Sequence, residues 1–167
     1  MEQTFDYVIV GAGSAGCVLA NRLSENPGVT VALLEAGPPD RSPYIHIPAG
    51  LLKLPYHTKI NWRYNSATQS TMKGRQIFVP RGKTLGGTSS INGMVYIRGH
   101  HRDYDEWRQR GCVGWDWDSV LPFFRKAEDQ ARGADEFHGV GGPLHVSDQP
   151  SKFELAEAAL QLSLIHI

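Results

Sequence analysis

The chain contains little cysteine, and the two cysteines that it has form no recognisable pattern. Cys17 and Cys112 are far apart among the 167 residues, and their spacing matches neither a metal site nor a CxxC motif. We therefore interpret them as free thiols, which is the usual state of cysteine in a reducing cytoplasm. The absence of a CxxxxC pair after the first elements also argues against a flavin-dependent disulfide reductase.

The chain has no excess of charge and no long apolar run. Seventeen Lys and Arg residues balance 17 Asp and Glu residues, so the net charge favours neither a nucleic acid nor an anionic membrane as partner. No apolar run approaches the roughly 20 residues needed to span a bilayer. Glu2, Asp6 and an immediate strand pattern leave no room for a signal peptide. We expect a cytoplasmic protein, and a peripheral contact with the inner face of the membrane stays open.

The first 37 residues do contain an ordered series of elements. Residues 7–10 form a short apolar run typical of a parallel strand buried on both faces. The turn GAGSAG follows at residues 11–16, and residues 17–25 then place their apolar side chains on one helical face. After a break at Asn26-Pro27-Gly28, residues 29–34 form a second apolar strand that ends at Glu35.

This order is the one that a dinucleotide site requires. Gly11 permits a tight turn, Gly13 allows a pyrophosphate to approach the backbone, and Gly16 allows the helix to pack closely on the strand. The helix N-terminus offers N–H groups to the phosphates, and Glu35 is placed to accept hydrogen bonds from a ribose. The alternative is that the glycines simply form a turn. The first predicted set of cofactor-binding residues is Gly11, Gly13, Ser14, Ala15, Gly16, Glu35 and Ala36.

A second glycine-rich segment, GKTLGGTSSINGMVYIRG, occupies residues 82–99. Gly86 and Gly87, followed by three hydroxyl side chains, expose backbone N–H groups and short donors that can lie flush against a flat ring system with polar edges. A glycine-rich turn before a strand is the alternative. The first unit alone leaves NAD and FAD open, whereas a nicotinamide dehydrogenase has no need of this second segment.

Taken together, these motifs resemble the glucose-methanol-choline (GMC) flavoprotein oxidoreductases, and most of all their choline dehydrogenase-like and bacterial alcohol dehydrogenase branch. The resemblance covers residues 5 to about 161. It rests on DYVIVGAGSAGCVLANRLSE, VALLEAG, GKTLGGTSSIN with Tyr96, Gly99 and Asp105 at the family spacing, Asn61-Trp62, Phe137-His138-Gly139 and GGPL at residues 141–144.

The resemblance implies an α/β fold, namely an incomplete Rossmann-like FAD-binding domain with the start of an α+β substrate-binding domain. We expect the βαβ unit over residues 1–37, an FAD-binding extension over 38–135, and the first part of the substrate domain over 136–161. The final residues 162–167, LSLIHI, can be encoded by a sequence that resembles a library adapter. We expect them to be non-native and the gene to continue, and a native helix end is the alternative.

The resemblance also implies that the second segment lines the flavin. In relatives that attach FAD covalently, a histidine stands at the position of Ile91, so we predict non-covalent FAD. This second predicted set of cofactor-binding residues is Trp62, Gly82, Leu85, Gly86, Gly87, Thr88, Ser89, Asn92, Gly93, Met94 and Val95.

The implied activity is the oxidation of an alcohol, such as choline or another primary alcohol, with hydride transfer to flavin N5. In the family the catalytic base is a histidine in the C-terminal part, so we assign no catalytic residue and no metal here and expect this chain alone to be inactive. The electron acceptor is open between oxygen and a quinone-linked chain. A hydroxynitrile lyase of the same fold and a non-catalytic flavin-binding module are the alternatives.

The remaining segments favour structural interpretations. The apolar, proline-bounded stretch at residues 45–56 suits a packed loop, a lid over the flavin or a membrane-touching patch. We interpret His100-His101 as a solvated turn, because adjacent side chains point apart. We expect His138 and His145 to lie in a hairpin or loop without a catalytic role. Helices are predicted over residues 104–110, over 115–128 with a cap at Asp116 or Asp118, and from 151 onward.

Overall fold

The structure is a computed structural model that describes residues 3–149, 151 and 153–164. The chain divides after Val95 into two compact units, which are described separately. Within the described ranges, no helix is both long and apolar enough to cross a membrane. The domain boundaries expected after residues 37, 135 and 161 stay predictions.

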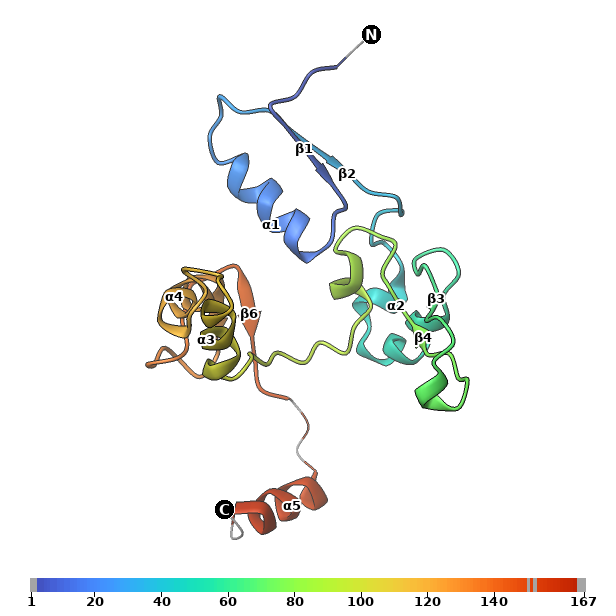
Figure 1. Cartoon of the computed structure of the whole chain (residues 1–167), viewed down its shortest axis with the longest axis vertical. Coiled ribbons are helices and arrows are strands. Elements are labelled where there is room, and N and C mark those ends of the chain that lie inside the picture. The colour runs from blue at the N-terminus through green and yellow to red at the C-terminus, as the bar shows by residue number, and fades with distance from the viewer. Residues whose placement is uncertain (1–2, 150, 152, 165–167) are drawn as a thin grey trace. The chain divides into compact units, whose positions relative to one another are not determined.

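The first unit begins with a βαβ arrangement, as predicted. Strand β1 (Tyr7–Val10) pairs in parallel with β2 (Val31–Leu34), and helix α1 (Ser14–Leu23) runs beside them (Figure 1). The helix begins three residues before the predicted range, at Ser14 within the GAGSAG motif. Strand β2 begins two residues late because residues 26–29 close a turn, in which the Val29 N–H donates to the Asn26 carbonyl at 3.0 Å.

Burial of this sheet differs from the expectation. We predicted strands buried on both faces, but Val8 is 58% and Val10 84% exposed. Among the residues that the structure describes, β1 and β2 form a two-stranded sheet without further strands. The apolar sequence of these strands is therefore typical of a strand in a larger, buried sheet. The described residues of this chain do not bury both of its faces.

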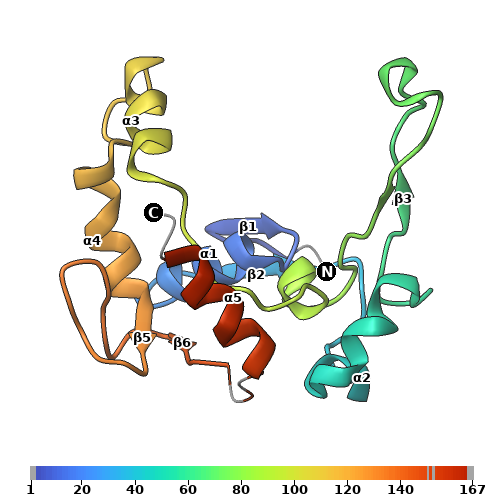
Figure 2. The same ribbon diagram turned by 90° about the horizontal axis from the view of Figure 1, so that it is seen from below.

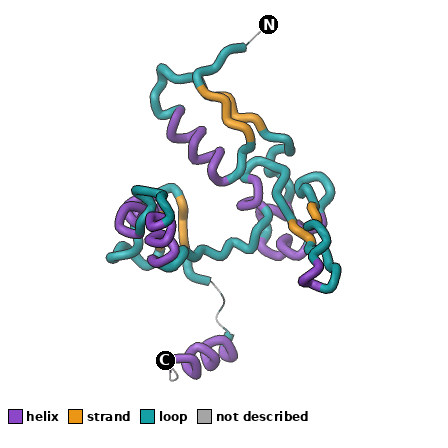
Figure 3. Tube along the Cα trace, viewed as in Figure 1, coloured by secondary structure: helices purple, strands orange, loops and turns teal. Residues whose placement is uncertain are grey.

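The rest of the first unit consists mostly of loops and short turns (Figures 2 and 3). A small core joins three distant side chains, Leu54, Ile60 and Ile91, each at most 4% exposed. The apolar stretch at residues 45–56 forms helical turns that reach this core through Leu54, while Leu52 is 82% exposed. The elements are α2 (Pro43–His46), the 3-10 turns η1 (Pro48–Leu52), η2 (Leu54–Tyr56), η3 (Ser70–Met72) and η4 (Gly87–Ser90), and the antiparallel pair β3 (Tyr64–Asn65) and β4 (Phe78–Val79).

The second unit contains α3 (His101–Gln109), α4 (Trp117–Ala127), β5 (Glu128–Gln130), β6 (Leu144–Val146) and α5 (Glu154–Leu164). Asp116 caps α4: its Oδ1 accepts from the Ser119 N–H at 3.1 Å and from the Ser119 hydroxyl at 2.8 Å. These bonds, led by the hydroxyl, lower the pKa of Asp116. The predicted helix is confirmed, and its cap is Asp116 rather than Asp118.

Our interpretation of His100-His101 as a solvated turn is wrong, because the pair forms the start of helix α3. His100 begins α3 as its N-cap: its Nδ1 accepts from the Arg102 N–H at 3.2 Å, and its own N–H donates to Asp103 at 2.8 Å. The two imidazole rings do not point apart, since their centroids lie 3.9 Å from each other. The reason is local, because a helix begins between the two residues.

Of the two expectations for the segment around His138 and His145, a hairpin or a loop, the structure shows a loop at His138 and places His145 in β6. Strands β5 and β6 pair in parallel, with Glu128 opposite Leu144. His138 contacts Asp135 at 2.8 Å, and this bond, with the backbone N–H groups of His138 and Phe137, lowers the pKa of Asp135 to about 2. His145 lies 3.3 Å from Asp129.

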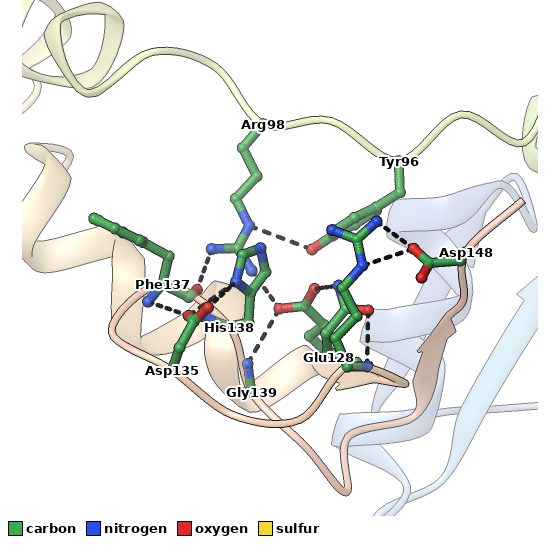
Figure 4. A network of polar contacts seen from close by, with 10 residues as sticks. Tyr96, Arg98, Glu128, Asp135, Phe137, His138, Gly139 and Asp148 are labelled. Carbon is green, nitrogen blue, oxygen red and sulfur yellow. Dashed lines mark hydrogen bonds and ion pairs between the residues drawn. The ribbon is translucent and has the colours of Figure 1, made fainter. Parts of the chain in front are cut away.

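A buried ion pair holds this segment in place (Figure 4). The Glu128 side chain is completely buried and accepts from Arg98 Nη2 at 2.6 Å and from the Gly139 N–H at 3.2 Å. Arg98 Nη1 donates to the Phe137 carbonyl at 2.5 Å. One guanidinium and one carboxylate therefore tie residues 137–139 to the end of α4.

The C-terminal helix α5 begins near the predicted position. Residues 162–164 belong to this helix, and residues 165–167 lie outside the described residues. The non-native origin of residues 162–167 stays a prediction.

Candidate functional site

A cavity of about 770 Å³ opens at the carboxyl ends of β1 and β2 in the first unit. Ligands of open α/β sheets bind at this edge, and the volume lies within the range of about 300–1,000 Å³ that is usual for cofactor sites. Its lining comes from both predicted sets and from additional residues. The lining residues are Val10, Gly11, Gly13, Leu34, Glu35, Ala36, Trp62, Tyr64, Arg81, Gly82, Gly87 and Thr88.

The structure brings the two glycine-rich motifs into direct contact through residues that lie more than 70 positions apart in the sequence. The Gly86 N–H donates to the Ala12 carbonyl at 2.7 Å, and the Ser14 and Ser89 hydroxyls lie 2.8 Å from each other. The two motifs therefore form one surface beside the cavity.

The glycines of the first motif differ in what surrounds them. Gly11 has a positive φ of 96°, which only glycine adopts easily, and a Cβ added at Gly11 or Gly13 would meet no atom within 4 Å. A Cβ at Gly16 would lie 2.0 Å from the Gly11 carbonyl oxygen, so glycine there permits the close packing that the motif predicts. The open space at Gly11 and Gly13 is what a pyrophosphate against the backbone requires.

Two glycines of the second motif, Gly82 and Gly87, lie directly against protein backbone. A Cβ at Gly87 would lie 2.7 Å from the Gly13 Cα, and a Cβ at Gly82 would lie 2.0 Å from the Gly87 carbonyl oxygen. We expected side chains to be left out at these positions to make room for FAD. The structure shows that they are also excluded by protein backbone, so both positions need glycine for packing as well as lining the cavity.

Glu35 uses its carboxylate to close the turn at the edge of the cavity. Its Oε2 accepts from the Ala12 N–H at 2.8 Å, and its Oε1 accepts from the Gly37 N–H at 2.9 Å. Each carboxylate oxygen has two lone pairs, so both can still accept a hydroxyl. The arrangement therefore leaves capacity for the two hydroxyls of a ribose.

The N-terminus of α1 adds positive potential on the same side. Its N-cap residue is Gly13, and no side chain caps the first turn. The unpaired N–H groups and the helix dipole therefore favour an anion beside Gly13. An open glycine turn, an uncapped helix end and a carboxylate with spare acceptor capacity fit a dinucleotide cofactor.

Several predicted residues do not line this cavity. Ser89, Asn92 and Met94 line a separate cavity of about 50 Å³ with residues of the stretch at 44–54. Met94 has a positive φ of 56° and is 62% exposed, and Val95 is 83% exposed. The predicted residues that line neither cavity are Ser14, Ala15, Gly16, Leu85, Gly86, Gly93 and Val95.

Sequence reasoning missed four lining residues, Val10, Leu34, Tyr64 and Arg81. Trp62 and Tyr64 stack with ring centroids 5.8 Å apart, and Lys83 Nζ lies 4.4 Å from the centroid of the Trp62 ring. The spacing of two residues around β3 places both rings on one face, a period that could have identified Tyr64. For Arg81 the available signal was a cation directly before the second glycine-rich motif.

The side chain of Ile91, from which we predict non-covalent FAD, is buried. Ile91 is 4% exposed and packs with Leu54 and Ile60. Its aliphatic side chain thus serves the small core of the first unit.

Comparison with known proteins shows the family of the chain. The family model of the GMC oxidoreductases matches residues 5–162. The chain belongs to the GMC oxidoreductase family. It is 49% identical to the alcohol dehydrogenase [acceptor] of Pseudomonas putida over 161 residues, and this match covers 96% of the chain and 29% of that protein. It is 48% identical to mitochondrial choline dehydrogenase of Homo sapiens, over 86% of the chain and 25% of that protein.

Solved GMC-type structures share the fold. Pyridoxine 4-oxidase from Mesorbium loti superposes with a TM-score of 0.88 and 39% identity, over 95% of the chain and 31% of that protein. Formate oxidase from Aspergillus oryzae RIB40, studied for FAD modification, gives a TM-score of 0.80 and 35% identity over 95% of the chain and 29% of that protein. The family is FAD-dependent, and the predicted α/β FAD-binding fold is confirmed. The chain spans less than a third of the length of these relatives.

Proposed function

We propose that this chain forms the FAD-binding part of an oxidoreductase that acts on the CH–OH group of a small alcohol, such as choline or another primary alcohol. The observation that carries the proposal is the cavity at the ends of β1 and β2, beside which both glycine-rich motifs meet. When bound at this cavity, FAD would supply the hydride acceptor for the alcohol carbon.

The residues of this chain bind and orient the cofactor. Gly11, Gly13 and the N-terminus of α1 would hold the pyrophosphate, because open backbone and unpaired N–H groups meet there. Glu35 would accept hydrogen bonds from the ribose hydroxyls while it keeps the turn closed through Ala12. With Ile91 at the attachment position, the cofactor is held without a covalent bond.

The substrate class and the electron acceptor are inferred from the names of the relatives. Their names include alcohol dehydrogenase [acceptor] and oxygen-dependent choline dehydrogenase, which support a small alcohol as substrate and either oxygen or another acceptor for the electrons. We propose a cytoplasmic protein, with the inner face of the membrane as the site of any quinone-linked acceptor. Cell fractionation followed by immunodetection of the chain tests this location.

A chimera tests the function directly. Residues 5–161 of this chain would replace the matching segment of the Pseudomonas putida alcohol dehydrogenase [acceptor], to which they are 49% identical. We expect the chimera to bind FAD and an alcohol to bleach its visible absorbance, which also separates an oxidoreductase from a lyase. A folded chimera that binds no FAD would refute the proposal.

A further inference from the structure

We propose that Arg81, which lines the same cavity as Gly11 and Gly13, binds the pyrophosphate of the dinucleotide. The assignment rests on the proposed function, since it concerns the same cofactor. Arg81 is the one cationic side chain among the described residues that line this cavity, beside the backbone N–H groups, the helix end and the Thr88 hydroxyl.

The backbone of Arg81 is fixed at the cavity wall. Its N–H donates to Asn61 Oδ1 at 2.9 Å, and its carbonyl accepts from the Trp62 N–H at 2.9 Å. Asn61 is only 3% exposed, and its amide nitrogen donates to the Pro55 carbonyl at 2.7 Å, so this anchor is itself held. A fixed backbone reduces the conformational freedom that the side chain loses when it binds an anion.

Arg81 also lies close to the glycine turn along a chain of backbone contacts. The next residue, Gly82, packs against the backbone of Gly87, and Gly87 packs against Gly13. Arg81 and Gly13 line the same cavity. A flexible guanidinium stem that starts two backbone contacts from the turn is well placed to reach a phosphate on it.

The guanidinium of Arg81 is available for an anion. Among the residues that the structure describes, none forms an ion pair or a hydrogen bond with the guanidinium. Glu35, which lines the same cavity, does not do so either. The other cation beside Gly82 differs, because Lys83 lies over the ring of Trp62. Of the two cations, Arg81 lines the cavity and is uncommitted.

The chemistry of arginine suits a pyrophosphate in particular. Its planar guanidinium donates two parallel hydrogen bonds to phosphate oxygens and stays charged at any physiological pH. A pyrophosphate bridge carries two negative charges, and the N-terminus of α1 contributes only about half a unit of positive charge. Arg81 would balance much of the remainder.

Calorimetric titration of the 167-residue chain tests the assignment with three ligands: FAD, ADP and adenosine. We expect Arg81→Gln to lower the affinity for FAD and for ADP by about tenfold to one hundredfold, which corresponds to the loss of a charge-assisted hydrogen bond. Adenosine, which has no phosphate, should change by less than about twofold. Arg81→Lys keeps the charge without the bidentate geometry and should give an intermediate loss of affinity.

Arg41→Gln is the matched control, because it removes the same charge from an exposed residue of the same unit outside the cavity. It should leave all three affinities unchanged, and circular dichroism confirms that each variant is folded. The assignment is overturned if Arg81→Gln lowers the affinities for ADP and adenosine equally, or if it leaves the affinity for ADP unchanged. In either case, FAD binding by the unmodified chain still supports the proposed function. If the folded, unmodified chain binds neither FAD nor ADP, the proposed function fails as well.

Discussion

Replacing Glu128 by Gln removes a negative charge from a position that solvent does not reach. The side chain of Glu128 is fully buried and that of Arg98 is 11% exposed, with 2.6 Å between Arg98 Nη2 and Glu128 Oε2. Gln has nearly the same shape, so the change leaves packing in place. The Arg98 guanidinium, however, then stays buried without its counter-charge.

The structure sets the expected magnitude. Removing one partner of a buried ion pair costs about 3–5 kcal/mol, because the remaining charge is poorly solvated. Additional loss comes from the Gly139 N–H, which donates to the same carboxylate at 3.2 Å. Since small domains have a free energy of unfolding of about 5–15 kcal/mol, the Glu128→Gln variant should lose a large share of the stability of the second unit.

Urea unfolding followed by tryptophan fluorescence measures this effect. Three of the chain's four tryptophans, Trp107, Trp115 and Trp117, belong to the second unit, so the signal reports mainly on that unit. The double variant with Arg98→Met removes both charges. We expect it to be more stable than the sum of the single losses predicts, by about 0.5–3 kcal/mol.

A surface ion pair in the same unit provides the control. Glu106 and Arg110 lie one helical turn apart with side chains 56% and 73% exposed. Glu106→Gln should cost only about 0.3–0.5 kcal/mol, which is typical of exposed helix pairs. If Glu128→Gln costs no more than Glu106→Gln, the reasoning from burial is refuted.

Three further predictions concern the cofactor and the pH dependence. Acid or heat denaturation of the FAD-loaded chain should release all flavin, because Ile91 cannot bond it, and flavin that stays on the precipitated chain would contradict this. Glu35→Gln should weaken adenosine and FAD alike by about tenfold in calorimetry, since it loses charge-assisted bonds to the ribose; an effect on neither ligand would exclude the ribose contact. By carboxyl NMR, Asp135 should titrate near its lowered pKa of about 2, so its stabilising contacts are complete above the ordinary value of 3.8 and lost as pH falls toward 2. His138→Ala should move that midpoint upward, and an unchanged midpoint would show that His138 is not its main cause.

Features encoded by short stretches of sequence could be predicted. The order of β1, α1 and β2 follows from apolar runs and a glycine turn, and the cap of α4 follows from an Asp at the start of an amphipathic pattern. Each of these depends on neighbours within a few residues. The glycine turn and Glu35 were therefore identified as parts of the site before their contacts were known.

Contacts between distant residues could not be predicted from the sequence alone. Arg98 and Glu128 are 30 residues apart, and neither belongs to a pattern that would distinguish a buried charge from a solvated one. For Arg81 the one local signal, a cation directly before the second glycine-rich motif, does not show that the residue lines a cavity, because its place there depends on the backbone contact with Asn61. The predicted burial of β1 was wrong for the same reason. An apolar strand indicates that it can be buried, but which segments pack on it depends on distant parts of the chain.

The glycines of this site meet two different requirements, the approach of a ligand and close packing of protein backbone. A Cβ at Gly13 would meet open space, which fits the bound ligand that the sequence motif predicts there. Gly87 touches the Gly13 Cα, so its lack of a side chain is already explained by protein backbone before any cofactor binds. A glycine pattern can therefore predict a cofactor site and still miss that glycines such as Gly82 and Gly87 are also required by the protein backbone beside them. Because Gly87 packs against Gly13, the second motif also helps to hold the glycine turn of the first.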